Sequence, residues 1–248
     1  MQYLLRRKIV AATLCLFLLP GFVHAQLRES INLPDHDSRL FHFGIQLGAN
    51  RAHFNFTHHE RFLTYNGSLN DSVLVVESLN STGLNLAWLV NMNLGEHFDL
   101  RAYPLNLVFT EKAFQYHLKY PDRPAGEEPI TTKKIQGITL ALPIQIKFSS
   151  DRINNFKVYM MAGGRIEYDL ASNKGARKAE SLVKLKPFDY GIDAGIGFHF
   201  YFPYFVLTPE LKLGYGLSNL HSRDENLKYS NVLDKINSRT VTFSLTVE

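Results

Sequence analysis

The chain has 248 residues, with 27 Lys and Arg against 23 Asp and Glu and a single cysteine. Three of the basic residues, Arg6, Arg7 and Lys8, lie in the first 25 residues together with Cys15. The remainder therefore carries 24 basic and 23 acidic side chains, a net charge of +1. Such a chain offers no basic surface for nucleic acid, and without cysteine it has neither disulfides nor thiolate chemistry.

Residues 1–25 have the pattern of a secretory signal peptide. The basic start is followed by an apolar run at 9–19 and a small residue, Ala25, after which we predict cleavage. The apolar run is shorter than the roughly 20 residues that a membrane-spanning helix needs. We interpret the polar segment 26–40 as a periplasmic lead-in and 41–248 as the folded domain.

That domain consists of segments in which apolar and polar residues alternate. Because successive side chains of a strand point to opposite faces, each segment predicts a strand with one apolar and one polar face. The eight segments are 41–57, 82–94, 98–118, 131–149, 156–171, 187–202, 205–218 and 237–248. Eight is the smallest strand number of closed outer-membrane barrels.

The connections between these segments alternate between short and long. The short ones are 94–97, 150–155 and 203–204, and the long ones are 58–81, 119–130, 172–186 and 219–236. This predicts an all-β fold, an eight-stranded antiparallel up-and-down transmembrane barrel, with all tight turns and both termini at one, periplasmic rim. Alternation slips near Asn50 and near Pro104, where we predict β-bulges.

Alternation does not say which face is inside, and a soluble lipocalin-like barrel would turn the apolar face inward. Two features favour the membrane. The polar faces are rich in glycine and charge, which suits a narrow lumen filled by side chains. The short connection at 203–204 is flanked by Phe200, Phe202, Tyr204 and Phe205, where a turn in water would carry Asn, Gly or Asp. Aromatic side chains at a barrel rim are typical of the lipid–water interface.

Charged residues of both signs fall on the predicted inner face. They are Asp99, Arg101, Lys147, Arg165, Glu167, Asp193, Glu210 and Lys212, with Lys157 and Asp169 in the same pattern. Charges away from water persist when they are paired, so we predict a structural network that plugs the barrel. A narrow ion path is the alternative.

Few residues suggest catalysis or cofactor binding. The glycine-rich run at 191–197 lies within a strand and lacks the spacing of a nucleotide loop. His221 and Ser222, with Asp224 and Glu225 nearby, are the one set of residues that could form a hydrolase site of a lipid-modifying barrel. The histidines lack the spacing of a metal site. We therefore predict no catalytic residues, no metal and no cofactor.

Several short runs together resemble the PorT (SprT) family of Bacteroidetes. The runs are Phe43–Gly48, Phe98–Pro104, Leu142–Phe148, Ser150–Asn155 leading into Tyr159–Gly164, and Pro209–Lys212 with Gly216–Asn219. The resemblance implies an integral outer-membrane barrel that the type IX protein secretion system requires, in some relatives also for gliding motility. It implies outer-membrane lipid and other type IX components as partners, and no enzyme activity. Glu248 departs from the aromatic end of many barrels.

The sequence thus predicts an accessory or assembly component of type IX secretion in the outer membrane. One alternative is an independent small barrel that serves as an adhesin, a stabilising protein or a narrow pore. The other is a lipid-modifying enzyme that uses His221 and Ser222.

Overall fold

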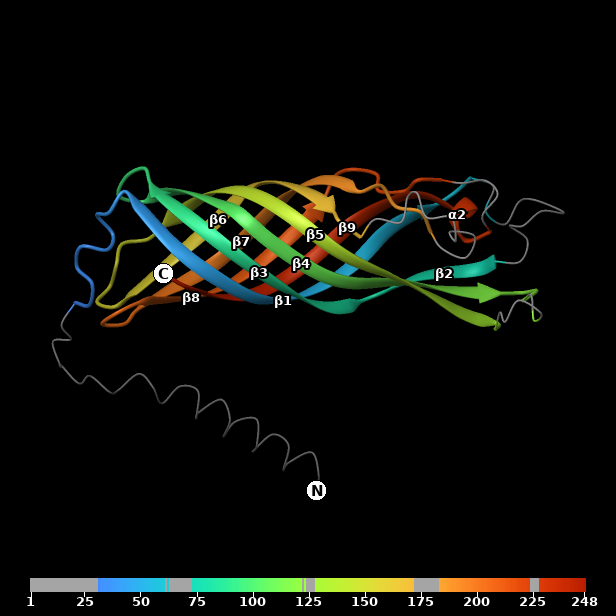
Figure 1. The fold of residues 1–248 in the computed structure, drawn as a ribbon, viewed down its shortest axis with the longest axis horizontal. Helices are drawn as coiled ribbons and strands as arrows, with labels where there is room; N and C mark the ends of the chain where they lie inside the picture. Colours follow the sequence, from blue (N-terminus) through green and yellow to red (C-terminus); the bar gives the residue numbers. More distant parts are fainter. Residues whose placement is uncertain are drawn as a thin grey trace, which may run out of the picture. The chain divides into compact units, whose positions relative to one another are not determined.

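Nine strands and one short helix make up the described part of the computed structural model (Figure 1), which comprises residues 31–60, 62, 73–121, 123, 128–171, 183–223 and 228–248. The predicted signal peptide 1–25 and residues 26–30 lie outside the described residues. The elements are β1 Phe41–His58, β2 Val73–Leu79, β3 Ser81–Asn93, β4 Phe98–Leu118, β5 Ile130–Ser149, β6 Phe156–Asp169, β7 Phe188–Tyr201, β8 Val206–Gly216, α2 Lys228–Asn231 and β9 Leu233–Val247. Within the described residues, no helix has the length and apolar character needed to cross a membrane.

Eight of these strands form a closed antiparallel ring. The hydrogen-bonded order is β4-β3-β1-β9-β8-β7-β6-β5, and pairing of β5 with β4 closes it. The first strand of the ring in sequence, β1, pairs with the last, β9, over Ile45–His58. The predicted all-β barrel of eight strands is therefore confirmed, and each predicted strand corresponds to one strand of the ring.

Two of the predicted long connections contain more regular structure than expected. The predicted loop 58–81 includes β2, which pairs with β4 beyond the end of β3 and is separated from β3 by Asn80 alone. The predicted loop 219–236 includes α2 and the first residues of β9. These strands begin at Val73 and Leu233, whose side chains are buried inside the ring. They lie beyond the outer apolar band, so the alternation typical of a membrane strand is absent there.

The connections sort to the two ends of the ring. Figure 1 shows the short turns β3–β4, β5–β6 and β7–β8 gathered at the end where the C-terminus is marked, and β2 and α2 at the opposite end. We call these the turn end and the loop end. The β5–β6 turn is tight because Asn154 adopts a positive φ of 54°, a backbone conformation that asparagine tolerates better than most residues. In the β7–β8 turn the Phe202 amide donates to the Phe205 carbonyl over 2.9 Å.

The bulge predicted near Pro104 is confirmed. From Ala102 to Leu107 β4 advances five residues, while its partner β5 advances four, from Ile144 to Leu140. The extra residue reverses which side chains of β4 point inward, from the odd-numbered Arg101 and Tyr103 to even-numbered positions. Proline cannot donate to the ladder, so the bulge falls where pairing is weakest.

The bulge predicted near Asn50 is wrong. The strand β1 pairs without a break with β3 through Ala52 and with β9 through Thr57. What changes is the environment. Before Asn50 the apolar side chains point outward, and after it the apolar Phe54 points inward while the polar Arg51 points outward. The apparent slip marks the edge of the outer apolar band.

The side chains of the turn-end half are arranged as in a membrane barrel. On β1, Ile45 and Leu47 are 63% and 62% exposed on the outer face, while Gln46 between them is fully buried in the lumen. The same alternation holds on the other strands of the ring, whose exposed side chains include Trp88, Ile144, Met160, Leu213 and Phe243. The soluble lipocalin-like alternative is therefore wrong, since it requires these side chains to line the interior.

Candidate functional site

The interior of the turn-end half is filled by a group of charged and hydroxyl side chains, which we call the turn-end network: Gln46, Asn91, Arg101, Tyr103, Tyr159, Glu210, Lys212 and Glu248. Arg101 on β4 and Glu210 on β8 form its centre, an ion pair that crosses the lumen with both side chains at 0% exposure. Glu210 also accepts hydrogen bonds from the Tyr159 hydroxyl and, over 2.7 Å, from Gln46. Every charge here has a partner, which is the condition for keeping ions out of water.

Lys212 lies one step further towards the loop end. Its Nζ donates to Gln46 Oε1 over 2.8 Å and to the Tyr103 hydroxyl over 3.2 Å, and it lies 3.6 Å from Glu210 Oε2. Tyr159 reaches this network because Gly197 of β7 leaves it room. A Cβ built at Gly197 would lie 2.3 Å from the tyrosine ring, so this glycine of the run at 191–197 serves close packing.

Glu248 is a member of the network that sequence reasoning missed. Its Oε1 accepts from Arg101 Nη2 over 3.1 Å and from Asn91 Nδ2 over 2.8 Å, and its backbone pairs with Val206. The alternation of β9 could have predicted that Glu248 points into the lumen, because Ser244 and Thr246 point inward and Glu248 is the next residue on the same face.

A second group of the predicted lumen charges lies beside the network at the same end. Lys147 Nζ lies 3.1 Å from Asp99 Oδ2 and 3.1 Å from His199 Nε2. The other ring nitrogen of His199 lies 2.8 Å from the Thr208 hydroxyl. These contacts link β4, β5, β7 and β8 across the lumen.

The turn end is covered by the described part of the predicted lead-in, residues 31–40, which we call the cap. Asp37 accepts from the Tyr201 hydroxyl over 2.7 Å and lies 3.6 Å from Lys157 and 3.7 Å from Arg152. Burial raises the pKa of this carboxyl, but hydrogen bonds from His36 and Tyr201 and the two cations outweigh burial and hold the pKa well below its ordinary value. The cap is thus fastened by ionised Asp37.

The remaining predicted lumen residues lie in the middle of the barrel. Arg165 Nε is 3.0 Å from Glu167 Oε1, and its Nη1 pairs with Asp193. All eight predicted residues therefore point into the lumen, but they form separate groups. Which charge pairs with which depends on strand register and on the bulge at Pro104, and the sequence pattern contains neither.

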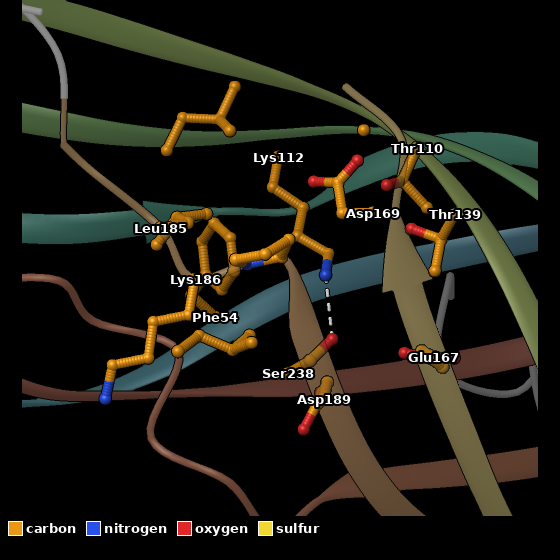
Figure 2. A pocket seen from close by; sticks show the side chains of 14 residues that line it. Phe54, Thr110, Lys112, Thr139, Glu167, Asp169, Leu185, Lys186, Asp189 and Ser238 are labelled. Carbon is orange, nitrogen blue, oxygen red and sulfur yellow. Dashed lines mark hydrogen bonds between the residues drawn. The ribbon is translucent and has the colours of Figure 1, made fainter. Parts of the chain in front are cut away.

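Beyond Arg165 lies a small chamber, shown in Figure 2. It has a volume of about 40 Å³, and Lys112 donates to the Ser238 hydroxyl across it over 2.7 Å. Glu167, Asp169 and Asp189 line it. Within the described residues, Asp189 Oδ2 is buried without a hydrogen-bond partner. A chamber of this size has room for one or a few water molecules, since one water needs at least ~10–15 Å³.

The loop-end half of the lumen is filled by a hydrophobic core that the sequence did not predict, and we call it the loop-end core. It comprises Phe54, Val73, Val76, Phe114, Tyr116, Leu118, Val183, Leu185, Leu220, Tyr229, Val232, Leu233 and Ile236. Phe114 is fully buried and stacks on Phe54 with ring centroids 5.1 Å apart. The strands thus continue past the apolar outer band and enclose an interior like that of a soluble protein.

The predicted interface aromatics lie around the β7–β8 turn. Phe200, Phe202 and Phe205 are 40%, 42% and 38% exposed, and Tyr204 is 92% exposed at the tip. Phe202 and Phe205 stack with centroids 4.9 Å apart across the turn. Their exposure at the rim suits a lipid–water interface.

In the alternative that makes the protein a lipid-modifying hydrolase, His221 would act with Ser222, but its hydroxyl partner is another serine. His221 Nδ1 donates to the Asp234 carbonyl over 3.2 Å, and Nε2 accepts from Ser230, not Ser222, over 2.9 Å. His221 is 3% exposed and Ser230 is fully buried beside the loop-end core, and burial lowers the pKa of the imidazole. The pair therefore satisfies two buried polar groups. Asp224 and Glu225 lie outside the described residues.

Metal-ligand geometry is also lacking in the described part of the chain, where no group of three or more His, Cys, Asp or Glu side chains could hold an ion.

A closed antiparallel ring with an apolar outer wall and a charged lumen defines the class of small outer-membrane β-barrels. The chain belongs to the family of outer membrane protein beta-barrel domains, whose pattern it matches over residues 24–222. The family and the outward apolar wall place the protein in the outer membrane. None of the curated proteins matches it in sequence.

Several solved structures are similar to this chain. Neisserial surface protein A is 12% identical, with 83% of this chain and 96% of that chain covered and a TM-score of 0.38. OprG from Pseudomonas aeruginosa is 13% identical, covers 82% and 92%, and has a TM-score of 0.37. Ail of Yersinia pestis is 13% identical, covers 83% and 96%, and has a TM-score of 0.32.

Proposed function

We propose that this protein is a closed outer-membrane barrel that acts through its surfaces, as an accessory or assembly component of type IX protein secretion. The observation that carries the first part is the filled lumen. In the part of the lumen that the described residues form, the turn-end network, the middle charges and the loop-end core succeed one another. A cavity of about 20 Å³ lies under the cap, and cavities of about 50 and 40 Å³ lie further along the lumen. Each holds a few water molecules at most.

The secretion role rests on the resemblance of the runs such as Phe98–Pro104 and Leu142–Phe148 to the PorT family. Their inward residues, Arg101 and Lys147, belong to the plug of the lumen. A plugged barrel cannot pass a protein, so a contribution to secretion has to come from the outer wall, the loops or the cap. We propose other type IX components and outer-membrane lipid as partners, periplasmic termini, and no enzyme activity.

Deletion of the gene tests the proposal directly. We expect loss of type IX cargo from the medium and its restoration by the wild-type gene. A lumen variant, Arg101→Met combined with Glu210→Leu, should restore secretion as well, because it replaces a buried ion pair by apolar groups without touching the outer surface. Normal secretion in the deletion strain would contradict the role.

Planar bilayer recording separates the proposal from an independent narrow pore. The purified protein should give no discrete conductance steps, and the lumen variant should behave the same way. Steps that appear with the wild-type protein and change with the lumen variant would establish an ion path instead. A catalytic role is tested by Ser222→Ala and Ser230→Ala, which should leave lipid A composition unchanged.

A further inference from the structure

Three cationic or ionisable side chains, Arg51 and His53 of β1 and Arg239 of β9, stand together on the outer wall at the loop-side edge of the apolar band. Register places His53 opposite Arg239 and Arg51 opposite Val241. Arg239 is therefore the direct neighbour of His53 and the diagonal neighbour of Arg51 across the two strands. Arg239 in turn pairs with Tyr215 of β8 and lies over its ring at 4.9 Å. We call Arg51, His53, Tyr215 and Arg239 the basic cluster.

The cluster lacks compensating negative charge. Within the described residues neither arginine has a carboxylate within ion-pair distance. Arg239 Nη2 donates to the Tyr215 hydroxyl over 3.4 Å, which leaves its positive charge uncompensated. Arg51 and Arg239 are diagonal neighbours across β1 and β9, so two positive charges lie close together on one face. The contrast with Lys134 on the outer face of β5 is direct, because Lys134 pairs with Glu111 over 2.8 Å. The basic cluster is therefore arranged for an anion from outside the chain.

The wall beside the cluster is hollowed. Ala162 of β6 and Ala194 of β7 are directly paired and point outward among larger side chains. Above them a hollow of about 780 Å³ extends to His53, Tyr215 and Arg239. A second hollow, of about 660 Å³, shares Ala162, Ala194 and Leu213 with the first and continues towards the turn end. The two form one groove that is apolar along its length and cationic at its loop-side end.

We propose that this groove binds a phosphate-bearing membrane lipid. The phosphate is held by Arg51 and Arg239 at the level where the apolar band ends, and one acyl chain lies over Ala162 and Ala194. Arginine suits this task because its planar group donates two hydrogen bonds to one phosphate. The groove lies on the wall that faces lipid, so its occupant comes from the surrounding leaflet. The site binds a lipid and carries out no chemistry.

Lipid binding to the full-length mature protein in detergent micelles tests the site. The probes are diphosphorylated lipid A, phosphatidylglycerol, phosphatidylcholine and inorganic phosphate. We expect the wild-type protein to prefer the net-anionic lipids over phosphatidylcholine by tenfold or more, and Arg239→Gln or Arg51→Gln to reduce that affinity five- to tenfold. Lys134→Gln is the matched control, since it removes an outer-face cation that already has a partner, and its affinity should stay at the wild-type value.

The apolar part of the site has its own pair of variants. Ala194→Phe fills the groove and should weaken binding of lipid A, whereas Ala49→Phe places the same ring on the outer face of β1, outside the residues that line the groove, and should not. Each variant is first checked for the heat-modifiable gel migration of a folded barrel. Equal affinity in wild type and in Arg51→Gln/Arg239→Gln, an equal loss in Lys134→Gln, or full competition by inorganic phosphate would overturn the proposal. The proposal would also be overturned if none of the lipid probes bound and a partner protein bound to the basic cluster through Arg239 instead.

Discussion

Both halves of this barrel have a filled interior, but the side chains that fill it are charged in the turn-end half and apolar in the loop-end half. In the turn-end half the interior is charged and the outside is apolar, with Glu210 at 0% and Ile45 at 63% exposure. In the loop-end half Phe114 and Ile236 are fully buried inside, while Arg51 and Lys235 face outward. One continuous set of strands thus passes from a membrane-protein arrangement to a water-soluble one. In β1 this change is decided by the surrounding medium and not by the ladder, because its pairing with β9 has no register shift from Ile45 to Thr57.

The largest effect on the free energy of unfolding is expected from removing the centre of the turn-end network. Glu210→Leu leaves Arg101 and Lys212 buried with fewer partners, and breaking a buried ion pair in this way costs about 3–5 kcal/mol. Urea unfolding in detergent, followed by the fluorescence of Trp88, gives the free energy of unfolding. The Arg101→Met/Glu210→Leu protein should recover at least half of the loss, and a single variant as stable as wild type would contradict the ionic role.

The corresponding test of the loop-end core is Phe114→Ala. Deleting a buried phenylalanine costs about 3–5 kcal/mol, and we expect the lower end of that range because only one half of the barrel loses packing. Limited proteolysis should show faster cleavage near the loop end, with unchanged protection at the turn end. Uniform loss of protection would show that the two halves unfold as one unit.

A smaller effect concerns the cap at the turn end. The folded pKa of Asp37 lies below the value of about 3.9 of an unfolded aspartate. Its contribution is therefore fully present above about pH 4 and is lost as the pH falls through the folded pKa. Because the carboxylate is 35% exposed, the loss should stay below about 1 kcal/mol after screening. The protection factors of the cap amides, in which the intrinsic pH dependence of exchange is divided out, should fall in acid in the wild-type protein, and Asp37→Asn should remove this change.

The smallest effect is expected on the outer face of β4 and β5. Lys134→Gln breaks an ion pair with Glu111 whose members are 66% and 39% exposed, and water replaces such a pair at little cost. No measurable change in the unfolding midpoint is expected. A clear loss would mean that outer-face charges above the apolar band support the barrel as much as the buried ones do.

The sequence predicted those parts of the fold that alternation encodes. The eight strands, the bulge at Pro104 and the inward faces that carry Arg101 and Glu210 follow from period-two patterns, which a pleated strand displays directly. The pairing of Arg101 with Glu210 across the lumen depends on register and closure, which no single strand records.

Asn50 shows where the same reasoning fails. In β1 the apolar positions move from Phe43, Ile45 and Leu47 to Phe54 and Phe56, and two causes produce that pattern. A bulge turns the side chains over, whereas a change of solvent leaves them in place and changes which residues suit each face. Only the unbroken pairing with β3 and β9 separates the two. The loop-end core was missed for the same reason.

The contact between Glu248 and Arg101 bears on the order of assembly. Arg101 belongs to the third strand of the ring in sequence, and its two carboxylate partners are supplied by β8 and by Glu248, which follows β9. A partly threaded barrel that lacks its final hairpin would leave this guanidinium in the lumen without either anion. The pairing of β9 with β1 and the arrival of both anions at Arg101 therefore belong to the same step, which disfavours a barrel that lacks β8 and β9.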